Sequence, residues 1–311
     1  MGKLLQKIQE INFPLYMFMK RVYGTTIGLW YFKKLYIKHI GFYNGKKRLK
    51  LLSHTGADKV IARSIRSGKP FMMGRFGSSE IRGIFKDEFD ILCFYAGFFP
   101  RDRKLLRRFK KTYIDAAKQL DMLMIWNYLN HFANKIKLIK TLPNIRYLSP
   151  LSASGPANCL WMKELKDKKI LVIHPFKKTI EAQQDKREKL GILPKIKSLE
   201  VIKAVQTLGN NEDCRFETWF DALDYMKKEI DKKDFDIALI GCGAYGLPLA
   251  AHVKSIGKQA VHVGGGLQLF FGIRGKRWDE SKNIKYNEHW VSPMKEDFLK
   301  DSKKFEGGCY W

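Results

Sequence analysis

From about residue 55 onward, short apolar runs alternate with amphipathic segments, and this alternation constrains the fold more than any other feature of the sequence. The apolar runs are typical of buried strands, and the amphipathic segments are typical of helices packed on them. The pattern therefore predicts an α/β domain with a mainly parallel sheet flanked by helices. Expected strands are 70–76, 122–126, 145–148, 169–173, 236–240 and 259–263, and expected helices are 57–66, 78–84, 103–121, 179–190, 221–232 and 247–256.

The first 54 residues differ from the rest in composition. Lysine, arginine and aromatic residues are interleaved there, and Glu10 is the single acid of the first 50 residues. Lys20–Arg21 and Lys33–Lys34 interrupt the apolar runs, so none reaches the roughly 18–20 residues that span a bilayer, and no signal peptide is expected. We predict a basic, aromatic-rich helical segment over residues 1–54, followed by one domain over residues 55–311. The segment suits an anionic membrane surface, or else it packs on the domain as an amphipathic helical pair.

The net charge of +27 on 311 residues favours an acidic partner: nucleic acid, an anionic membrane or a phosphate-bearing substrate. The five cysteines form no C-x-x-C pair, which argues against a disulfide framework and against a zinc site. We therefore expect a reducing, cytoplasmic compartment with buried thiols.

A G-x-G-x-x-G spacing follows the expected strand 236–240, with its glycines at Gly241, Gly243 and Gly246. Such a loop can place helix N-terminal amides against phosphate. Three interpretations remain open: contact with a phosphate or nucleotide, close packing of backbone, or an NAD(P) site. An NAD(P) site would need an acid at the end of the next strand to bind the ribose hydroxyls, but the sequence there is Val261-His262-Val263.

The expected strand 70–76 delivers Arg75, and Gly77, Ser78 and Glu80 follow it at the start of a helix. One interpretation is a plain helix start with a favourable first-turn acid. The other is a grip on diphosphate and metal by Arg75 and Glu80.

The expected strand 169–173 is followed by His174, then by Lys177 and Glu181 on the next helix. A histidine near lysines can donate to phosphate or shuttle a proton. The alternative is a structural histidine at the sheet edge whose ring nitrogens hydrogen-bond within the protein.

The tail from Arg274 to Trp311 has little regular pattern but many aromatic and charged residues, so we expect it to wrap back over the domain. Within it, Arg277, Trp278 and Asp279 offer a cation, an aromatic plane and a carboxylate. This combination can clamp a sugar or phosphate, or it can be an aromatic anchor beside a surface ion pair.

Taken together, these stretches resemble bacterial glycosyltransferases of the GT-D type, which belong to surface-polysaccharide gene clusters. The resemblance covers residues 55–311 and rests on the segments 75–80, 96–100, 172–176, 241–250, 258–266 with Gln268, 271–279 and 306–311. It implies a Rossmann-like fold, a nucleotide-sugar donor and a divalent metal, Mn²⁺ or Mg²⁺. The family motif reads R-F-G-D-G-E, whereas this chain has Ser78 in place of the aspartate. One carboxylate gives a weaker metal site, so either Glu80 holds the metal with help from Ser78, or cations replace it.

The resemblance implies a glycosyltransferase of hexosyltransferase type that transfers a sugar to a surface-glycan or lipid-linked acceptor. The diphosphate charge would be stabilised by Arg75, Lys177 and a metal at Glu80. The candidates for a base that takes the proton of the acceptor hydroxyl are His174, Glu181, Asp279, Glu288 and His289. The expected catalytic residues are Arg75, Glu80, His174 and Glu181, and the expected nucleotide-sugar-binding residues are Gly77, Ser78, Lys177, Gly241, Gly243, Tyr245, Gly246, Gly265, Gln268, Arg277 and Trp278.

We expect the enzyme to work in the cytoplasm, peripherally on the inner face of the plasma membrane, without nucleic acid as a partner. The alternatives are a non-enzymatic nucleic-acid-binding protein, for which the basic stretch 101–111 is the candidate surface, and an NAD(P)-dependent sugar-modifying enzyme.

Overall fold

The computed structural model describes residues 42–44, 47–125, 142, 145–150, 159–209, 211, 213–279, 284–300, 302 and 308–311. Its strands are β1 (Phe42–Asn44), β2 (Lys47–Leu51), β3 (Phe71–Arg75), β4 (Met122–Ile125), β5 (Tyr147–Pro150), β6 (Lys169–His174), β7 (Ser198–Lys203), β8 (Ile237–Ile240) and β9 (Gln259–His262). Its α-helices are α3 (His54–Ser67), α4 (Ser78–Phe85), α5 (Phe89–Ala96), α6 (Leu106–Ala117), α8 (Lys177–Ala182), α9 (Arg187–Leu190), α10 (Trp219–Asp231), α11 (Gly246–Ser255) and α12 (Lys276–Asp279). The 3₁₀ helices are η1 (Arg103–Leu105), η3 (Leu160–Leu165), η4 (Gln184–Lys186), η5 (Gly243–Tyr245), η6 (Gly265–Phe271) and η7 (Lys295–Asp297).

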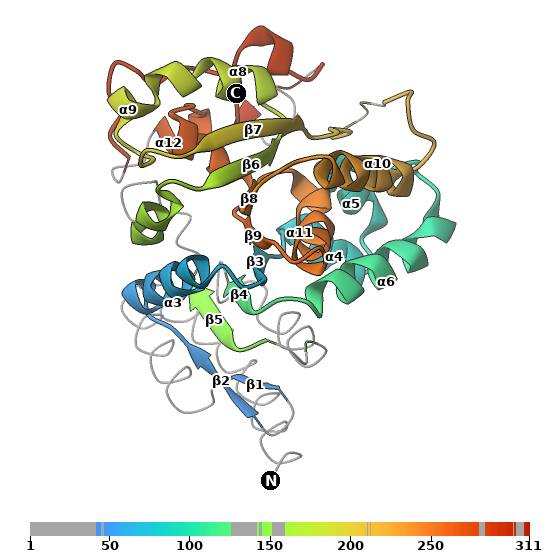
Figure 1. Ribbon diagram of the computed structural model, residues 1–311. Helices are drawn as coiled ribbons and strands as arrows, with labels where there is room; N and C mark the ends of the chain where they lie inside the picture. Colours follow the sequence, from blue (N-terminus) through green and yellow to red (C-terminus); the bar gives the residue numbers. More distant parts are fainter. Residues whose placement is uncertain are drawn as a thin grey trace, which may run out of the picture.

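The described strands form one sheet in the order β1-β2-β5-β4-β3-β9-β8-β6-β7 (Figure 1). The β1–β2 pair is antiparallel, and the other paired strands are parallel, which confirms the predicted α/β fold with a mainly parallel sheet. From β6 the chain moves outward to β7 and then back across to β8. Ligands of such sheets bind beyond the carboxyl ends of the strands, at the point where the order reverses.

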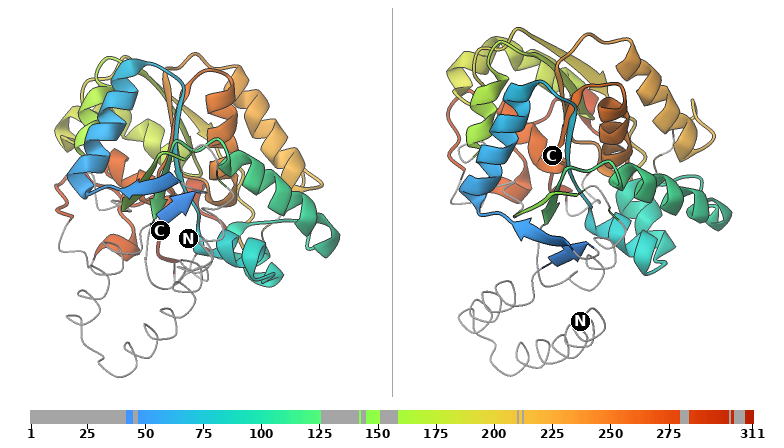
Figure 2. Two further views of the ribbon diagram at one scale, coloured as in Figure 1. Left: turned by 90° about the horizontal axis from the view of Figure 1, so that it is seen from below. Right: turned by 60° about the horizontal axis from the view of Figure 1, so that its bottom comes forward.

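Helices cover both faces of the sheet (Figure 2, left). Because successive side chains of a strand point to opposite faces, Leu171 and Ile173 of β6 join one apolar cluster, and Ile170 and Val172 join the other. The first cluster includes residues of α4, α5, α6, α10 and α11, and the second includes residues of α3, η3 and α8. The two clusters hold the central strands rigidly in place, so their ends can position a site.

Local sequence signals set the ends of the longer helices. The Ser53 hydroxyl accepts a hydrogen bond from the Gly56 N–H at the start of α3, and α3 ends at Gly68 with a φ of 63°. At the start of α10, Thr218 and Asp221 each accept a hydrogen bond from the other's backbone N–H. Each such cap stabilises its helix by about 1 kcal/mol.

The predicted N-terminal helical segment is wrong where the structure describes it. Residues 42–44 and 47–51 form β1 and β2, and β2 pairs with β5, so this part of residues 1–54 belongs to the sheet of the domain. Residues 1–41 lie outside the described part of the chain, and so does any contact they make with a membrane. Among the residues that the structure describes, no helix combines the length and apolar character needed to cross a bilayer.

Other differences from the predicted elements are local. Helix α5 and strand β7 were not predicted, and the helix expected over residues 179–190 is broken into α8, η4 and α9. The expected helix 103–121 begins with η1 and ends at Ala117. As expected, the tail wraps over the domain: the Asp297 carboxylate accepts hydrogen bonds from the N–H and hydroxyl of Thr179 in α8, at 2.7 and 2.6 Å.

Candidate active site

The ends of β3, β9, β8 and β6 open into one cavity of about 420 Å³. The strand order brings together residues far apart in the chain: Arg75 after β3, His174 of β6, Gly241 after β8 and His262 of β9 all line it. Residues of the α5 end, of the loop after β7, of α12 and of the tail complete its walls. All three strand-end motifs that the sequence singles out therefore meet in the same cavity.

Arg75 is held between two strands in this cavity. A β-carbon at Gly264, which follows β9 with a φ of +79°, would lie 3.1 Å from Nη1 of Arg75, so the glycine backbone leaves room for the guanidinium. Burial lowers the pKa of Arg75, and the charge of Arg277 lowers it further, while Tyr310 and Glu80 act in the opposite direction. Arg75 and Arg277 are thus two cations of one site.

Glu80 lies in the first turn of α4 and is 6% exposed. A β-carbon at Gly77 would lie only 1.9 Å from Oε2 of Glu80, so the carboxylate folds back over the backbone that precedes the helix. Ser78, the first residue of α4, lines the cavity beside it. Glu80 is therefore both a first-turn acid of α4 and an acid of the cavity.

The glycine loop serves packing at two of its three glycines. A β-carbon at Gly241 would lie 2.7 Å from the carbonyl oxygen of Gly264, and one at Gly246 would lie 2.2 Å from Nε2 of His262. Gly243 has a φ of +56° and open space around its α-carbon, and it lines the cavity. Tyr245 also lines the cavity, but its ring is stacked on Trp219 at 4.9 Å. The loop therefore shapes the cavity mainly through close backbone contact.

His174 lines the cavity as a neutral hydrogen-bond donor. Its Nδ1 accepts a hydrogen bond of 3.0 Å from the Phe176 N–H, so the ring proton lies on Nε2. Burial lowers the pKa of His174 to about 3. With its proton on Nε2 and no capacity to take a second one near neutral pH, His174 does not fit the role of general base.

His262, which was not expected as a site residue, lies in the floor of the cavity and is 3% exposed. Its Nδ1 is buried and has no hydrogen-bond partner among the described residues. Burial and the neighbouring charge of Arg75 lower its pKa to about 3. The sequence offered no signal for it beyond its place after an apolar run.

The tail closes the cavity through Tyr310, another residue that was not singled out. Gln268, fully buried in η6, donates from Nε2 to the carbonyl oxygens of Arg274 at 2.9 Å and Tyr310 at 3.1 Å. A β-carbon at Gly265 would lie 2.3 Å from the Tyr310 ring, and Trp278 packs against the same ring at 5.9 Å. Four residues expected from the resemblance therefore line the cavity together with Tyr310: Gly265, Gln268, Arg277 and Trp278.

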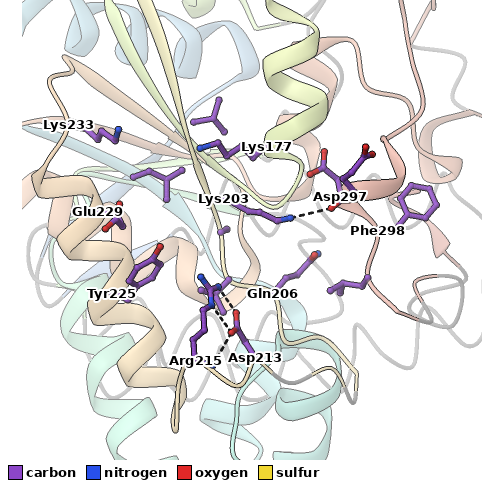
Figure 3. A pocket seen from close by; sticks show the side chains of 16 residues that line it. Lys177, Lys203, Gln206, Asp213, Arg215, Tyr225, Glu229, Lys233, Asp297 and Phe298 are labelled. Carbon is purple, nitrogen blue, oxygen red and sulfur yellow. Dashed lines mark hydrogen bonds and ion pairs between the residues drawn. The ribbon is translucent and has the colours of Figure 1, made fainter.

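Lys177 and Glu181 lie elsewhere. Lys177 begins α8 and lines a second cavity of about 510 Å³ (Figure 3). Its Nζ lies 3.6 Å from the Glu181 carboxylate. The sequence places Lys177 three residues after His174, but the chain turns into α8 there and carries the lysine away from the strand ends. Neither the role expected for Lys177 at the diphosphate nor the catalytic role expected for Glu181 fits this arrangement, because neither residue lines the first cavity.

The three remaining base candidates are also outside the first cavity. Asp279 lies 4.0 Å from Nε of Arg274, and Glu288 lies 3.4 Å from Nε2 of His289. None of the three lines the cavity.

The described residues do not fit a resident divalent cation. Glu80 is the single acidic side chain among those lining the first cavity, and the described residues contain no group of three His, Cys, Asp or Glu that could hold a metal. Mn²⁺ and Mg²⁺ prefer several oxygen ligands, and two guanidinium groups in the same cavity oppose a cation.

No family model matches this chain, and no curated protein matches it. Solved structures of domain of unknown function 1792 align with 78% of the chain at TM-scores between 0.43 and 0.46. Two of them are 14% identical over 94% of their own length, and one of these is described as having a distinct glycosyltransferase fold. The other, described as a new glycosyltransferase from Streptococcus sanguinis, is 10% identical over 98% of its length. Likenesses this distant carry no argument about the activity of this chain.

Proposed function

We propose that this chain is a glycosyltransferase of hexosyltransferase type that moves a sugar from a nucleoside-diphosphate donor to a glycan or lipid-linked acceptor. One observation carries the proposal: Arg75 and Arg277 line a single cavity at the strand ends, with Glu80 as its one described acid. A cavity with two guanidinium groups and one carboxylate favours an anion, and planar guanidinium groups bind phosphate oxygens in pairs. The motif resemblance to GT-D-type enzymes supplies the reaction class.

In such a transfer, the bond between the anomeric carbon and the diphosphate oxygen breaks, and its electron pair leaves with the diphosphate. The acceptor hydroxyl oxygen forms the new bond to the anomeric carbon, and its proton is released to solvent water. Arg75 and Arg277 stabilise the charge that builds on the diphosphate. We expect these cations to do this without a resident metal, because the donor set around Glu80 does not fit one.

The acceptor fits the second cavity, which shares Val205 and Gln206 with the first. Its charged lining is balanced, and the described groups are Lys177, Lys203, Arg215, Lys233, Asp213, Glu229, Glu296 and Asp297. Figure 3 shows Arg215 paired with Asp213, beneath the ring of Tyr225. A balanced set of donors and acceptors with aromatic faces, here Tyr225 and the exposed Phe298, suits a polyhydroxylated glycan better than an anion.

Two alternative functions are less well supported by the described residues. An NAD(P) enzyme needs an acid after β9 for the ribose, and His262 occupies that place. Nucleic-acid binding would use the basic stretch 101–111, but Arg101 pairs with Asp90, Arg103 and Lys110 pair with Asp87, and Lys111 pairs with Asp115.

We place this activity in the cytoplasm, at the inner face of the plasma membrane. All five cysteines are free thiols, four of them buried, which suits a reducing compartment. The basic, aromatic composition of residues 1–41 suits an anionic lipid surface.

The test is a thermal-shift screen of nucleotide sugars and nucleoside diphosphates, with Mn²⁺ and with EDTA. We expect stabilisation by at least one nucleoside-diphosphate sugar, equal in both conditions, and loss of it in Arg75→Gln. Arg66→Gln, which removes a cation that pairs with Glu164 on the far side of α3, is the control. A protein that no nucleotide sugar stabilises contradicts the proposed function, and stabilisation that requires Mn²⁺ contradicts the metal-free site.

A further inference from the structure

We propose that His262 is a ligand-binding residue of the first cavity, donating a hydrogen bond from Nδ1 to the phosphate group held beside Arg75. The inference rests on the proposed function and extends it to a residue that the motifs do not mark. Three features of His262 support it: its place in the cavity lining, its packing against Gly246 and its closeness to Arg75.

The first feature is a buried nitrogen of His262 that has no hydrogen-bond partner among the described residues. His262 is 3% exposed, it lines the cavity, and its Nδ1 has no partner among the described residues. A buried polar group without a hydrogen bond destabilises a fold, and such groups are rare in native structures. An unpaired nitrogen at His262, in the lining of this cavity, is explained if a bound ligand accepts a hydrogen bond from it.

The second feature fixes the ring. Gly246 begins α11, and a β-carbon there would lie 2.2 Å from Nε2 and 2.5 Å from Cδ2 of His262. The third glycine of the G-x-G-x-x-G spacing therefore makes room for this imidazole. Because Nε2 faces the positive N-terminal end of α11, a lone pair is favoured on Nε2, and the ring proton is left on Nδ1.

The third feature identifies the ligand group. His262 of β9 lines the same cavity as Arg75, the last residue of the adjacent strand β3. The Arg75 charge helps to keep the imidazole neutral. A neutral N–H beside a guanidinium suits an anionic oxygen that Arg75 already attracts, which in this site is a phosphate oxygen of the donor. It adds a hydrogen bond without adding a third full positive charge, beside Arg75 and Arg277, that would retain the product.

The test compares three variants in their binding of nucleoside diphosphates by isothermal titration calorimetry, and in their ligand-free thermal stability. His262→Leu removes both nitrogens at similar volume, His262→Asn keeps a polar group at the position of Nδ1, and His262→Gln places it near Nε2. We expect the dissociation constant to rise roughly tenfold or more in the Leu and Gln variants. In the Asn variant we expect it to stay within about threefold of the wild-type value.

Ligand-free stability separates binding from packing. Because His262→Leu removes an unpaired buried polar group, we expect its melting temperature to equal or exceed that of wild type. His252→Leu is the matched control: His252 hydrogen-bonds Asp231 at 2.7 Å outside the cavity, so this change is expected to lower stability and leave binding unchanged.

Equal binding by wild type and His262→Leu overturns the inference and leaves the proposed function standing. Equal losses in the Asn and Gln variants also overturn it, because the role of Nδ1 would then be wrong. If the wild type binds no nucleoside diphosphate, the proposed function and the inference fail together.

Discussion

The hydroxyl oxygen of Tyr310 accepts a hydrogen bond of 2.8 Å from Nη1 of Arg277. The same guanidinium lies 4.6 Å from the centre of the Tyr310 ring, and Gln268 holds the Tyr310 carbonyl oxygen from the other side. Arg277 is carried on the four-residue helix α12. The tail residue therefore orients one of the two cations of the cavity.

Tyr310→Phe is expected to weaken nucleoside-diphosphate binding by roughly tenfold, because Arg277 loses the partner that orients it while the ring packing on Gly265 stays. Calorimetry measures the affinity. Tyr286→Phe is the control, since Tyr286 also packs on an arginine, Arg274 at 5.1 Å, but does not line the cavity. Unchanged affinity in Tyr310→Phe would show that Arg277 needs no help from the tail.

Glu80→Gln is expected to reduce sugar transfer by about a hundredfold or more while the melting temperature changes by a few degrees at most. The substitution keeps the side chain over Gly77 but removes the charge that acts on Arg75. Initial rates with a fixed donor measure the effect. Glu88→Gln, which breaks an ion pair with Arg82 outside the cavity, is expected to transfer normally. Wild-type transfer by Glu80→Gln would remove Glu80 from the site.

The protein is expected to lose stability on mild acidification because of its two buried histidines. His174 and His262 have pKa values of about 3 in the folded state, whereas an unfolded histidine titrates near its ordinary 6.5. Between these values the unfolded chain binds more protons, so this stability is complete above the unfolded pKa and is lost as the pH falls. Each ring contributes a slope approaching about 1.4 kcal/mol per pH unit.

Urea unfolding at about pH 7, 6 and 5 measures this slope. His262→Leu should flatten it by the share of one histidine. A stability that does not change between about pH 7 and 5 would mean that the two rings are not held neutral by the fold.

Phe298→Ala is expected to raise the KM for a glycan acceptor several-fold while leaving slow donor hydrolysis unchanged, because Phe298 lines the second cavity and not the first. Met294→Ala is a matched control, since Met294 is 39% exposed against 41% for Phe298 but lines neither cavity. A change in donor hydrolysis, or an equal effect of both variants, would argue against an acceptor in the second cavity.

Removal of residues 1–41 is expected to reduce binding to anionic vesicles in a flotation assay more than it reduces transfer to a soluble acceptor. The deletion keeps β1 and β2, and so leaves the described sheet complete. Neutral vesicles serve as the control, because the attraction depends on lipid charge. An unchanged floating fraction would contradict a membrane role for this segment.

The strands of the central sheet could be predicted from sequence because they are short, apolar and bounded by glycine or polar residues. Helix α5 could not, because Phe89–Ala96 is apolar on nearly all sides and shows no helical period. Strand β7 was missed for a related reason: it lies at the sheet edge, and only Val201 and Ile202 of its residues are buried.

The site could be predicted in part. Arg75, Glu80, His174 and the glycines stand directly at strand ends, where local sequence marks them. In the sequence, His262 was noted only because it stands where an NAD(P) site would have an acid. The role proposed for it depends on Gly246 and Arg75, which the fold brings close to it. The tail was expected to wrap over the domain, but its contact with Arg277 depends on packing that no local pattern encodes.

The pairing of β3 with β9 has a consequence for how the protein is made. Arg75 leaves the ribosome well before β9, Arg277 and Tyr310. Until then β3 lacks one of its two neighbours, and its apolar residues have an open edge that other chains can pair with. A nascent chain therefore has no complete cavity, and a ligand of the cavity can stabilise the fold only after β9 and Tyr310 have been made.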